Sequence, residues 1–217
     1  MKTLKEYIIE GILDIEDNVE NLSVESLIED FIKENYNTTA KIQIKKKGNK
    51  YIVSTNGTVV VKNKNITELT NGLFEWGEVE GDFSCNNCKS LKDLIGAPKE
   101  VGANFYCSNC TSLKSLEGAP EKVGANFDCG NCTSLKSLEG APEKVGNFYC
   151  YGCTALKSLE GAPKKVGKDF YCRNCTSLKS LEGAPEKVGN FYCEKCGEKF
   201  TEEDVRAVCD VKRQIKV

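Results

Sequence analysis

The sequence contains no histidine, and it has only one methionine, one tryptophan and five prolines. Without histidine, the chain cannot build a Ser-His-acid triad or a Cys-His nucleophile, and a zinc site would need cysteine or carboxylate ligands alone. Ordinary hydrolase chemistry is therefore not expected, and the composition favours a protein that is not an enzyme.

Long apolar runs and blocks of one charge sign are also absent. No segment approaches the length of a membrane span, and the N-terminus lacks the apolar core of a secretory signal. The formal net charge is −2, and lysine and glutamate are mixed within every repeat, so no basic face indicates a nucleic acid. We therefore expect no export, no membrane partner and no nucleic-acid partner.

A 22-residue repeat, close to VGANFYCSNCTSLKSLEGAPEK, fills the middle of the chain. A repeat of this length matches one coil of a leucine-rich repeat or of a β-solenoid. Each position of the repeat would then recur about every 5 Å, the distance between neighbouring strands. The copies begin at Val79, Val101, Val123, Val145 and Val166, and a broken sixth copy begins at Val188.

Within one copy, an alternating pattern predicts a short strand. Phe105 and Cys107 would point inward and Tyr106 outward. After the strand, Cys110 and two leucines recur every three residues, which suits a turn or a 3₁₀ path with its apolar side inward. The Gly-Ala-Pro segment at 118–120 then turns the chain back. No coil could bury this apolar face alone, so neighbouring coils are required.

The shorter copies read VGNFYCYGCTAL, as in residues 145–156, and this resembles the LxxLxLxxCxxL signature of cysteine-type leucine-rich repeats. The CxxLxxLxxxPxxV half of the repeat also resembles the BspA-like leucine-rich repeats. Both resemblances cover about residues 79–196, and they imply coils with one short parallel β-strand each. Because Val, Phe and Cys replace the usual leucines, the curvature of the solenoid is left open.

Six CxxC pairs and the separate Cys209 account for the thirteen cysteines. Buried core thiols, metal ligands shared by adjacent coils, and disulfides or redox couples are three interpretations. The core is favoured, because the first cysteine takes an inward strand position and the second faces backbone inside the coil. We expect a reducing compartment, no cofactor and no metal ligand, with a zinc-binding or thiol-redox repeat protein as the alternative.

Outward-facing strand residues are the candidates for recognition. Tyrosine beside amide side chains suits protein binding, because tyrosine offers contact area and a hydrogen bond at a low cost in entropy. The alternative is that these stacked rows only stabilise the sheet. A separate lysine row, offset by glutamates, is interpreted as a solvated face. The candidate protein-binding residues are Asn104, Tyr106, Asn126, Asp128, Asn147, Tyr149, Asp169, Tyr171, Asn190 and Tyr192.

The segments on either side of the repeats predict caps. Residues 23–78 combine a helix over 23–35, with Ser23 as its N-cap, and three strand-like runs, ending in a divergent first coil. Residues 197–217 combine a helix that begins with Thr201 and Asp204 as a capping box and an alternating strand pattern over 211–217. Such caps would cover the open ends of the solenoid at 79–196.

The first residues, MKTLKEYIIEG, resemble the capsid-targeting leader of internal head proteins of large tailed phages. The resemblance implies cleavage between Glu10 and Gly11, because Ile8 and Glu10 fit the processing rule of that family. Residues 1–10 would then be a cleavable leader, and residues 11–22 an acidic, flexible linker. An ordinary amphipathic N-terminal turn is the alternative.

Taken together, these patterns predict a repeat solenoid with leucine-rich-repeat-like coils, a small α/β N-terminal cap and a helix-strand C-terminal cap. The expected function is a protein-interaction scaffold encoded by a phage and packaged in its capsid. The expected partner is an unknown protein, such as a host factor, and the expected location is the virion interior or the bacterial host cytoplasm.

Overall fold

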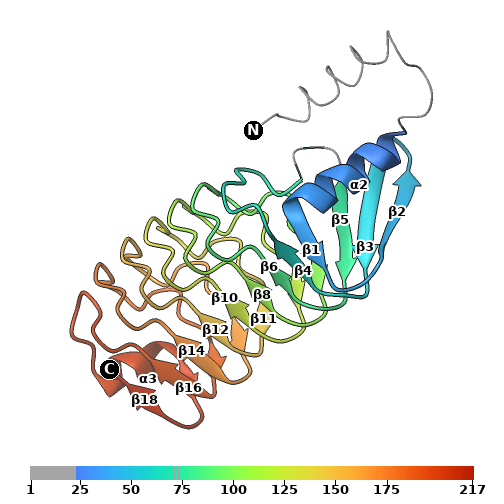
Figure 1. Cartoon of the computed structure of the whole chain (residues 1–217). Coiled ribbons are helices and arrows are strands. Elements are labelled where there is room, and N and C mark those ends of the chain that lie inside the picture. Colours follow the sequence, from blue (N-terminus) through green and yellow to red (C-terminus); the bar gives the residue numbers. More distant parts are fainter. Residues whose placement is uncertain (1–22, 71, 73) are drawn as a thin grey trace.

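The computed structural model describes residues 23–70, 72 and 74–217, and it shows an elongated parallel β-solenoid of about seven coils with a cap at each end (Figure 1). The predicted repeat solenoid is thereby confirmed. The predicted leader and linker lie outside the described residues. Within the described part of the chain, no helix is long and apolar enough to cross a membrane.

Each repeat coil carries two short strands. The predicted Phe-Tyr strand is present in every coil, as in β8 (Phe105–Tyr106) and β10 (Phe127–Asp128). A second strand, which the sequence analysis did not predict, lies at the start of each copy, as in β9 (Lys122–Val123). It spans only two residues in the repeats and buries only the valine, so it is too short for an alternating pattern to reveal it.

The strands stack into rows that run along the solenoid (Figure 1). The Phe-Tyr strands form one nine-stranded sheet, parallel except at its first pair. In chain order it contains β1 (Tyr36–Thr38), β4 (Val59–Val61), β6 (Phe83–Ser84), β8, β10, β12 (Phe148–Tyr149), β14 (Asp169–Tyr171), β16 (Asn190–Tyr192) and β18 (Ile215–Lys216).

The valine strands form a second row, which consists of two sheets. The break lies between β9 and β11, which are neighbours in space but belong to different sheets. The first sheet contains β2 (Ile42–Lys47), β3 (Lys50–Thr55), β5 (Glu75–Val79), β7 (Glu100–Val101) and β9. The second contains β11 (Lys144–Val145), β13 (Lys165–Val166), β15 (Lys187–Val188) and β17 (Asp210–Val211).

A column of phenylalanine rings fills the centre of the solenoid. Ring centroids of successive coils are 5.1 to 5.7 Å apart, and the six rings from Phe83 to Phe191 are fully buried. The paired leucines and cysteines of each copy line the same interior. Burying one such ring contributes roughly 1.5–3 kcal/mol, so the core depends on the stacking of neighbouring coils.

Tight turns close each coil after the strand. The Leu113 N–H donates to the Cys110 carbonyl at 3.0 Å, and the Ala119 N–H donates to Leu116 at 2.9 Å, which gives the expected three-residue turn path. Gly118 has a φ of 82°, and a Cβ there would lie 2.4 Å from the backbone nitrogen of Ile95 in the preceding coil. Glycine is therefore required at this turn.

The third residue of each CxxC segment adopts a left-handed conformation, which the sequence analysis did not anticipate. Asparagine holds this position in four coils, with φ between 57° and 64°, and Gly152 holds it in a fifth. Asparagine and glycine tolerate this conformation better than other residues. The last CxxC segment instead places Lys195 there, at a φ of 58°.

The N-terminal cap has the predicted helix and strands. Helix α2 (Val24–Asn35) begins at Ser23, whose hydroxyl accepts a hydrogen bond from the Ser26 N–H, and it buries Ile28 and Ile32. The β2–β3 hairpin and β4 follow it, as expected. An aromatic cluster joins the cap to the phenylalanine column, because the Trp76 ring lies 5.8 Å from Phe83.

The C-terminal cap begins with helix α3 (Glu202–Val208), and the predicted capping box between Thr201 and Asp204 is present. The alternating pattern over residues 211–217 predicts a single strand. In the structure, the chain bends between β17 and β18, and these two strands join two different sheets. Val211 pairs with Val188, and Ile215 pairs with Phe191. These residues therefore form a shortened further coil, because its valine and isoleucine take the buried positions of the repeat.

Candidate functional site

The amide row of the strand face binds mainly to itself. We use this name for Asp82, Asn104, Asn126, Asn147, Asp169 and Asn190. Each side-chain oxygen accepts hydrogen bonds from the next coil: Oδ1 of Asn104 accepts from Nδ2 of Asn126 at 2.8 Å and from its backbone N–H at 3.1 Å. Oδ1 of Asn126 accepts in the same way from Asn147. These bonds hold the coils in register and leave the row few free groups for a partner.

The tyrosine strip lies beside the amide row in the C-terminal half of the solenoid. It consists of Tyr149, Tyr171 and Tyr192, whose ring centroids are 5.0 and 4.5 Å apart and whose planes differ by 16° and 11°. The guanidinium of Arg173 lies 4.7 Å from the Tyr192 ring centroid and is ion-paired with Glu194. The strip is therefore a half-buried aromatic surface with a cation at its edge.

The strip does not extend through the N-terminal half of the face. Tyr106 is separated from Tyr149 by Asp128, whose Oδ1 accepts a hydrogen bond from the Gly130 N–H at 2.8 Å. Burial raises the pKa of the Asp128 carboxyl, and that hydrogen bond partly offsets the rise. The structure thus brings three of the predicted tyrosines into contact and leaves Tyr106 apart from them.

Desolvation also affects the strip itself. It raises the pKa of Tyr171 to about 12, with the Asp169 carboxylate as the second cause. The Tyr171 hydroxyl lies 3.3 Å from Oδ2 of Asp169 and donates to it. The hydroxyl group of Tyr171 is therefore neutral near neutral pH.

The interior cysteines form a ladder of buried thiols. All thirteen cysteines are free, and twelve are buried. The second thiol of a pair donates to the carbonyl of the first cysteine in the preceding coil, at 3.2 Å from Cys132 to Cys107 and from Cys175 to Cys150. Burial raises the pKa of the Cys107 and Cys150 thiols well above its ordinary value. This arrangement agrees with the interpretation of these cysteines as core residues.

The last pair keeps the ladder hydrogen bond, because the Cys196 thiol donates to the Cys172 carbonyl at 3.2 Å, but it adds a contact between its own two sulfur atoms. Sγ of Cys193 lies 2.9 Å from Sγ of Cys196, and both lie within 4.8 Å of Sγ of Cys172 in the coil before. Hydrogen bonds from the thiols of Cys172 and Cys193 lower the pKa of Cys196 to about 4. We call these three residues the terminal thiol cluster. Among the described residues, it is the only group of this kind that could hold a metal ion.

The sequence predicts the same core role for this pair as for the other five. A signal was present, because Lys195 replaces asparagine and Gly197 replaces the threonine that follows the other pairs from Cys110 onward. Cys196 is also the only one of the thirteen cysteines that is partly exposed.

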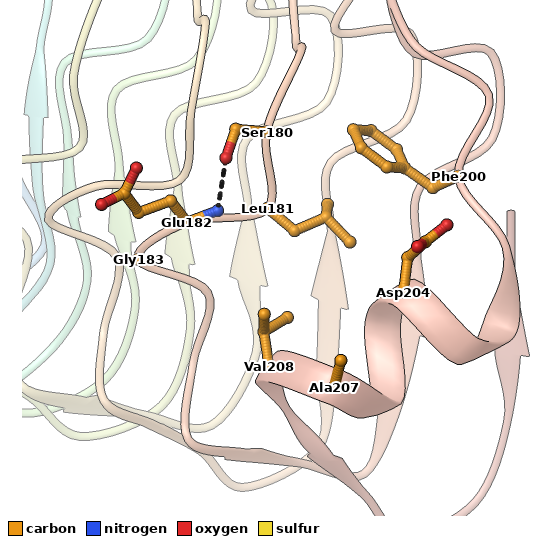
Figure 2. A pocket seen from close by; sticks show the side chains of 8 residues that line it. All are labelled: Ser180, Leu181, Glu182, Gly183, Phe200, Asp204, Ala207 and Val208. Carbon is orange, nitrogen blue, oxygen red and sulfur yellow. Dashed lines mark hydrogen bonds between the residues drawn. The ribbon is translucent and has the colours of Figure 1, made fainter.

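Beside helix α3 there is an open hollow of about 600 Å³ (Figure 2). Leu181, Phe200 and Val208 give it an apolar lining. The Asp204 carboxylate at its edge accepts hydrogen bonds from Thr201, which lower the pKa of Asp204. Since this carboxylate serves the helix cap, the hollow shows no gathered set of reactive groups.

No protein-family model, no curated protein and no solved structure matches this chain. A solenoid fold does not define a function by itself, so the function has to be argued from the surface and its side chains. The resemblances to leucine-rich repeats and to a capsid-targeting leader stay predictions.

Proposed function

We propose that the protein is a non-enzymatic interaction scaffold that binds a protein partner along the tyrosine strip and Arg173. The observation that supports the proposal is the stacking of three tyrosines, at 5.0 and 4.5 Å, on adjacent strands of the solenoid. Tyrosine and arginine are the residues most enriched among those that dominate binding energy at protein interfaces.

The strip is suited to binding because its side chains are already ordered. Each ring packs against its neighbour, and the register of the strands below it is held by the amide row. A partner would therefore immobilise few free rotamers, and ordering of side chains is one of the main costs of association. The hydroxyl groups and the guanidinium would supply directional hydrogen bonds to the partner's carbonyl and carboxylate oxygens.

The carboxylates of the same face give little support to catalysis. Asp169 accepts hydrogen bonds from Asn190 and Tyr171, and Asp128 accepts one from the backbone of Gly130. Neither has a histidine partner, since the chain contains none. A scaffold is therefore the function that these side chains favour.

The phage-related part of the proposal depends on the sequence alone. Residues 1–10 carry the resemblance to a capsid-targeting leader, and they lie outside the described structure. A packaged and processed protein would begin at Gly11 when it is recovered from particles, and one that still begins at Met1 would contradict processing.

The binding proposal is tested with a double substitution, Tyr149→Ser and Tyr171→Ser, in the full chain. The matched control is Lys157→Ser with Lys179→Ser, which changes exposed residues of the same two coils outside the strip. Immobilised chains are incubated with lysate of the candidate bacterial host, and retained proteins are quantified by mass spectrometry. A partner retained by the native chain and the control, but reduced at least about tenfold by the tyrosine variant, supports the proposal. Equal retention by all three chains contradicts it.

A further inference from the structure

The terminal thiol cluster has a feature that no interior coil shares. Among the described residues, only Cys172, Cys193 and Cys196 bring three ligand atoms within 4.8 Å of one another. Three thiolates bound to one ion at about 2.3 Å in a trigonal plane stand about 4 Å apart, which this spacing accommodates. The sulfur atoms of Cys193 and Cys196, which are 2.9 Å apart, would separate by about 1 Å on binding, and all three sulfur atoms already lie within 4.8 Å of one another.

The position of the cluster in the stack explains why it forms here. The Cys172 thiol still donates to the carbonyl of Tyr192 in the following coil, at 3.4 Å. Within the described structure, Cys193 makes no such bond to a carbonyl, as is also true of Cys107 and Cys150, but its sulfur faces Cys196 at 2.9 Å. In the register of β16 and β18, Val217 lies opposite Cys193, at the position that a cysteine holds in the repeats. No cysteine of a following coil therefore covers the cluster.

Access and surroundings also differ from those of the interior. Cys196 is partly exposed, and the segment after it, Gly197–Glu198, lacks the leucines that seal the other coils. An ion could therefore reach the sulfur atoms without unfolding of the solenoid, whereas the interior pairs are fully enclosed.

We infer that the terminal thiol cluster is a binding site for one thiophilic d¹⁰ metal ion, Zn²⁺ or Cu⁺, ligated by Cys172, Cys193 and Cys196. Soft thiolate ligands select these ions over Mg²⁺ or Ca²⁺. Three thiolates complete the shell of Cu⁺, and Zn²⁺ would add a water molecule on the exposed side of Cys196. Binding releases the protons of the Cys172 and Cys193 thiols to solvent and changes no oxidation state.

The site goes beyond the proposed scaffold function, although it lies next to the strip. Cys193 follows Tyr192 directly, and Cys172 follows Tyr171. An ion at this position would fix the last two strands of the strip from their buried side. The metal-binding test below does not depend on any protein partner.

The test uses the reduced full chain under anaerobic conditions, with Zn²⁺ or Cu⁺ supplied in separate titrations against a chromophoric chelator of each ion. Cys196→Ser removes one ligand. Cys175→Ser is the matched control, because it changes the equivalent thiol one coil earlier, outside the cluster. Circular dichroism establishes that both variants keep the native fold, and alkylation of Cys196 with and without metal reports on the site directly.

Binding of about one ion per chain, weakened at least about 100-fold by Cys196→Ser and retained by Cys175→Ser, would support the site; loss of a second-shell partner alone costs 10–100-fold. Protection of Cys196 from alkylation by the same ion would support it independently of the variants. The inference is overturned by the absence of binding, by several ions per chain, or by equal binding in Cys196→Ser. The stronger of the two titrations identifies the ion.

Discussion

The interior coils and the last full coil share one repeat but treat their cysteines differently. In the interior, each sulfur is enclosed by coils on both sides, and the second thiol of a pair donates to a backbone carbonyl. In the last coil, the Cys196 thiol also donates to a carbonyl, that of Cys172, but its sulfur in addition faces Cys193 at 2.9 Å and is partly exposed. The same CxxC motif is therefore enclosed between two full coils in the interior, and it is partly exposed where the following coil is shortened.

This difference shows how a repeat protein can obtain a special site without a new motif. A solenoid coil is stabilised by its neighbours, so the coil next to a cap has a different environment from the others. Here the last full coil also carries a few substitutions, including Lys195 for asparagine and the loss of leucines after Cys196. Three experiments test the difference between the interior coils and the last full coil.

The largest effect is expected from removing one ring of the phenylalanine column. Phe148→Ala should lower the free energy of unfolding by about 3–5 kcal/mol, because the ring stacks on Phe127 and on Phe170 and leaves a cavity. Ile215→Ala, at the same position of the shortened coil, should cost about 2 kcal/mol, because Ile215 pairs with Phe191 on one side only. Urea unfolding followed by circular dichroism measures both, and equal losses would show that the interior of the column and its C-terminal end are equivalent.

The second effect concerns thiol reactivity. Alkylation of the native protein at pH 6 should modify Cys196 at least about 100-fold faster than Cys153, because Cys196 is partly exposed and Cys153 is buried. The lowered pKa of Cys196 places its thiolate above about pH 4, so its rate should stay nearly constant from pH 6 to 8. Peptide mass spectrometry gives the rates. A rate at Cys196 that rises tenfold per pH unit would show an ordinary thiol.

The smallest effect is expected from the left-handed residue of the CxxC segment. Lys195→Asn should raise the free energy of unfolding by about 1 kcal/mol, because asparagine tolerates a φ of 58° better than lysine does. The reverse change in the coil before, Asn174→Lys, should lower it by a similar amount. Thermal unfolding of both variants measures the pair. A change of the same sign in both would show that backbone strain does not distinguish the two coils.

Much of the fold could be predicted because the signals are local and repeated. The inward positions of Phe105 and Cys107, the Gly-Ala-Pro turn and both helix caps follow from periodicity and from hydrogen bonds between near neighbours. The short valine strands could not be predicted in this way, because a strand of two residues has no period. They form only because an identical segment lies one coil away.

The candidate site could be predicted only in part. The outward rows followed from the alternation of the strand, but the hydrogen bonding within the amide row and the stacking of Tyr149, Tyr171 and Tyr192 depend on the register of neighbouring coils. The replacement of tyrosine by Asp128 is visible in the sequence. That it separates Tyr106 from Tyr149 follows from the pairing of the strands.

The sequence alone determined the repeat, the inside and outside of each coil and the places where the solenoid is closed. These features depend on which residues avoid water and on the turns that they permit, and both are properties of short segments. The tertiary structure alone decided which side chains of different coils touch, and it brought Cys172 to Cys193 and Cys196 at one end. Such contacts depend on what lies above and below each coil, and a motif within one coil carries no information about its neighbours.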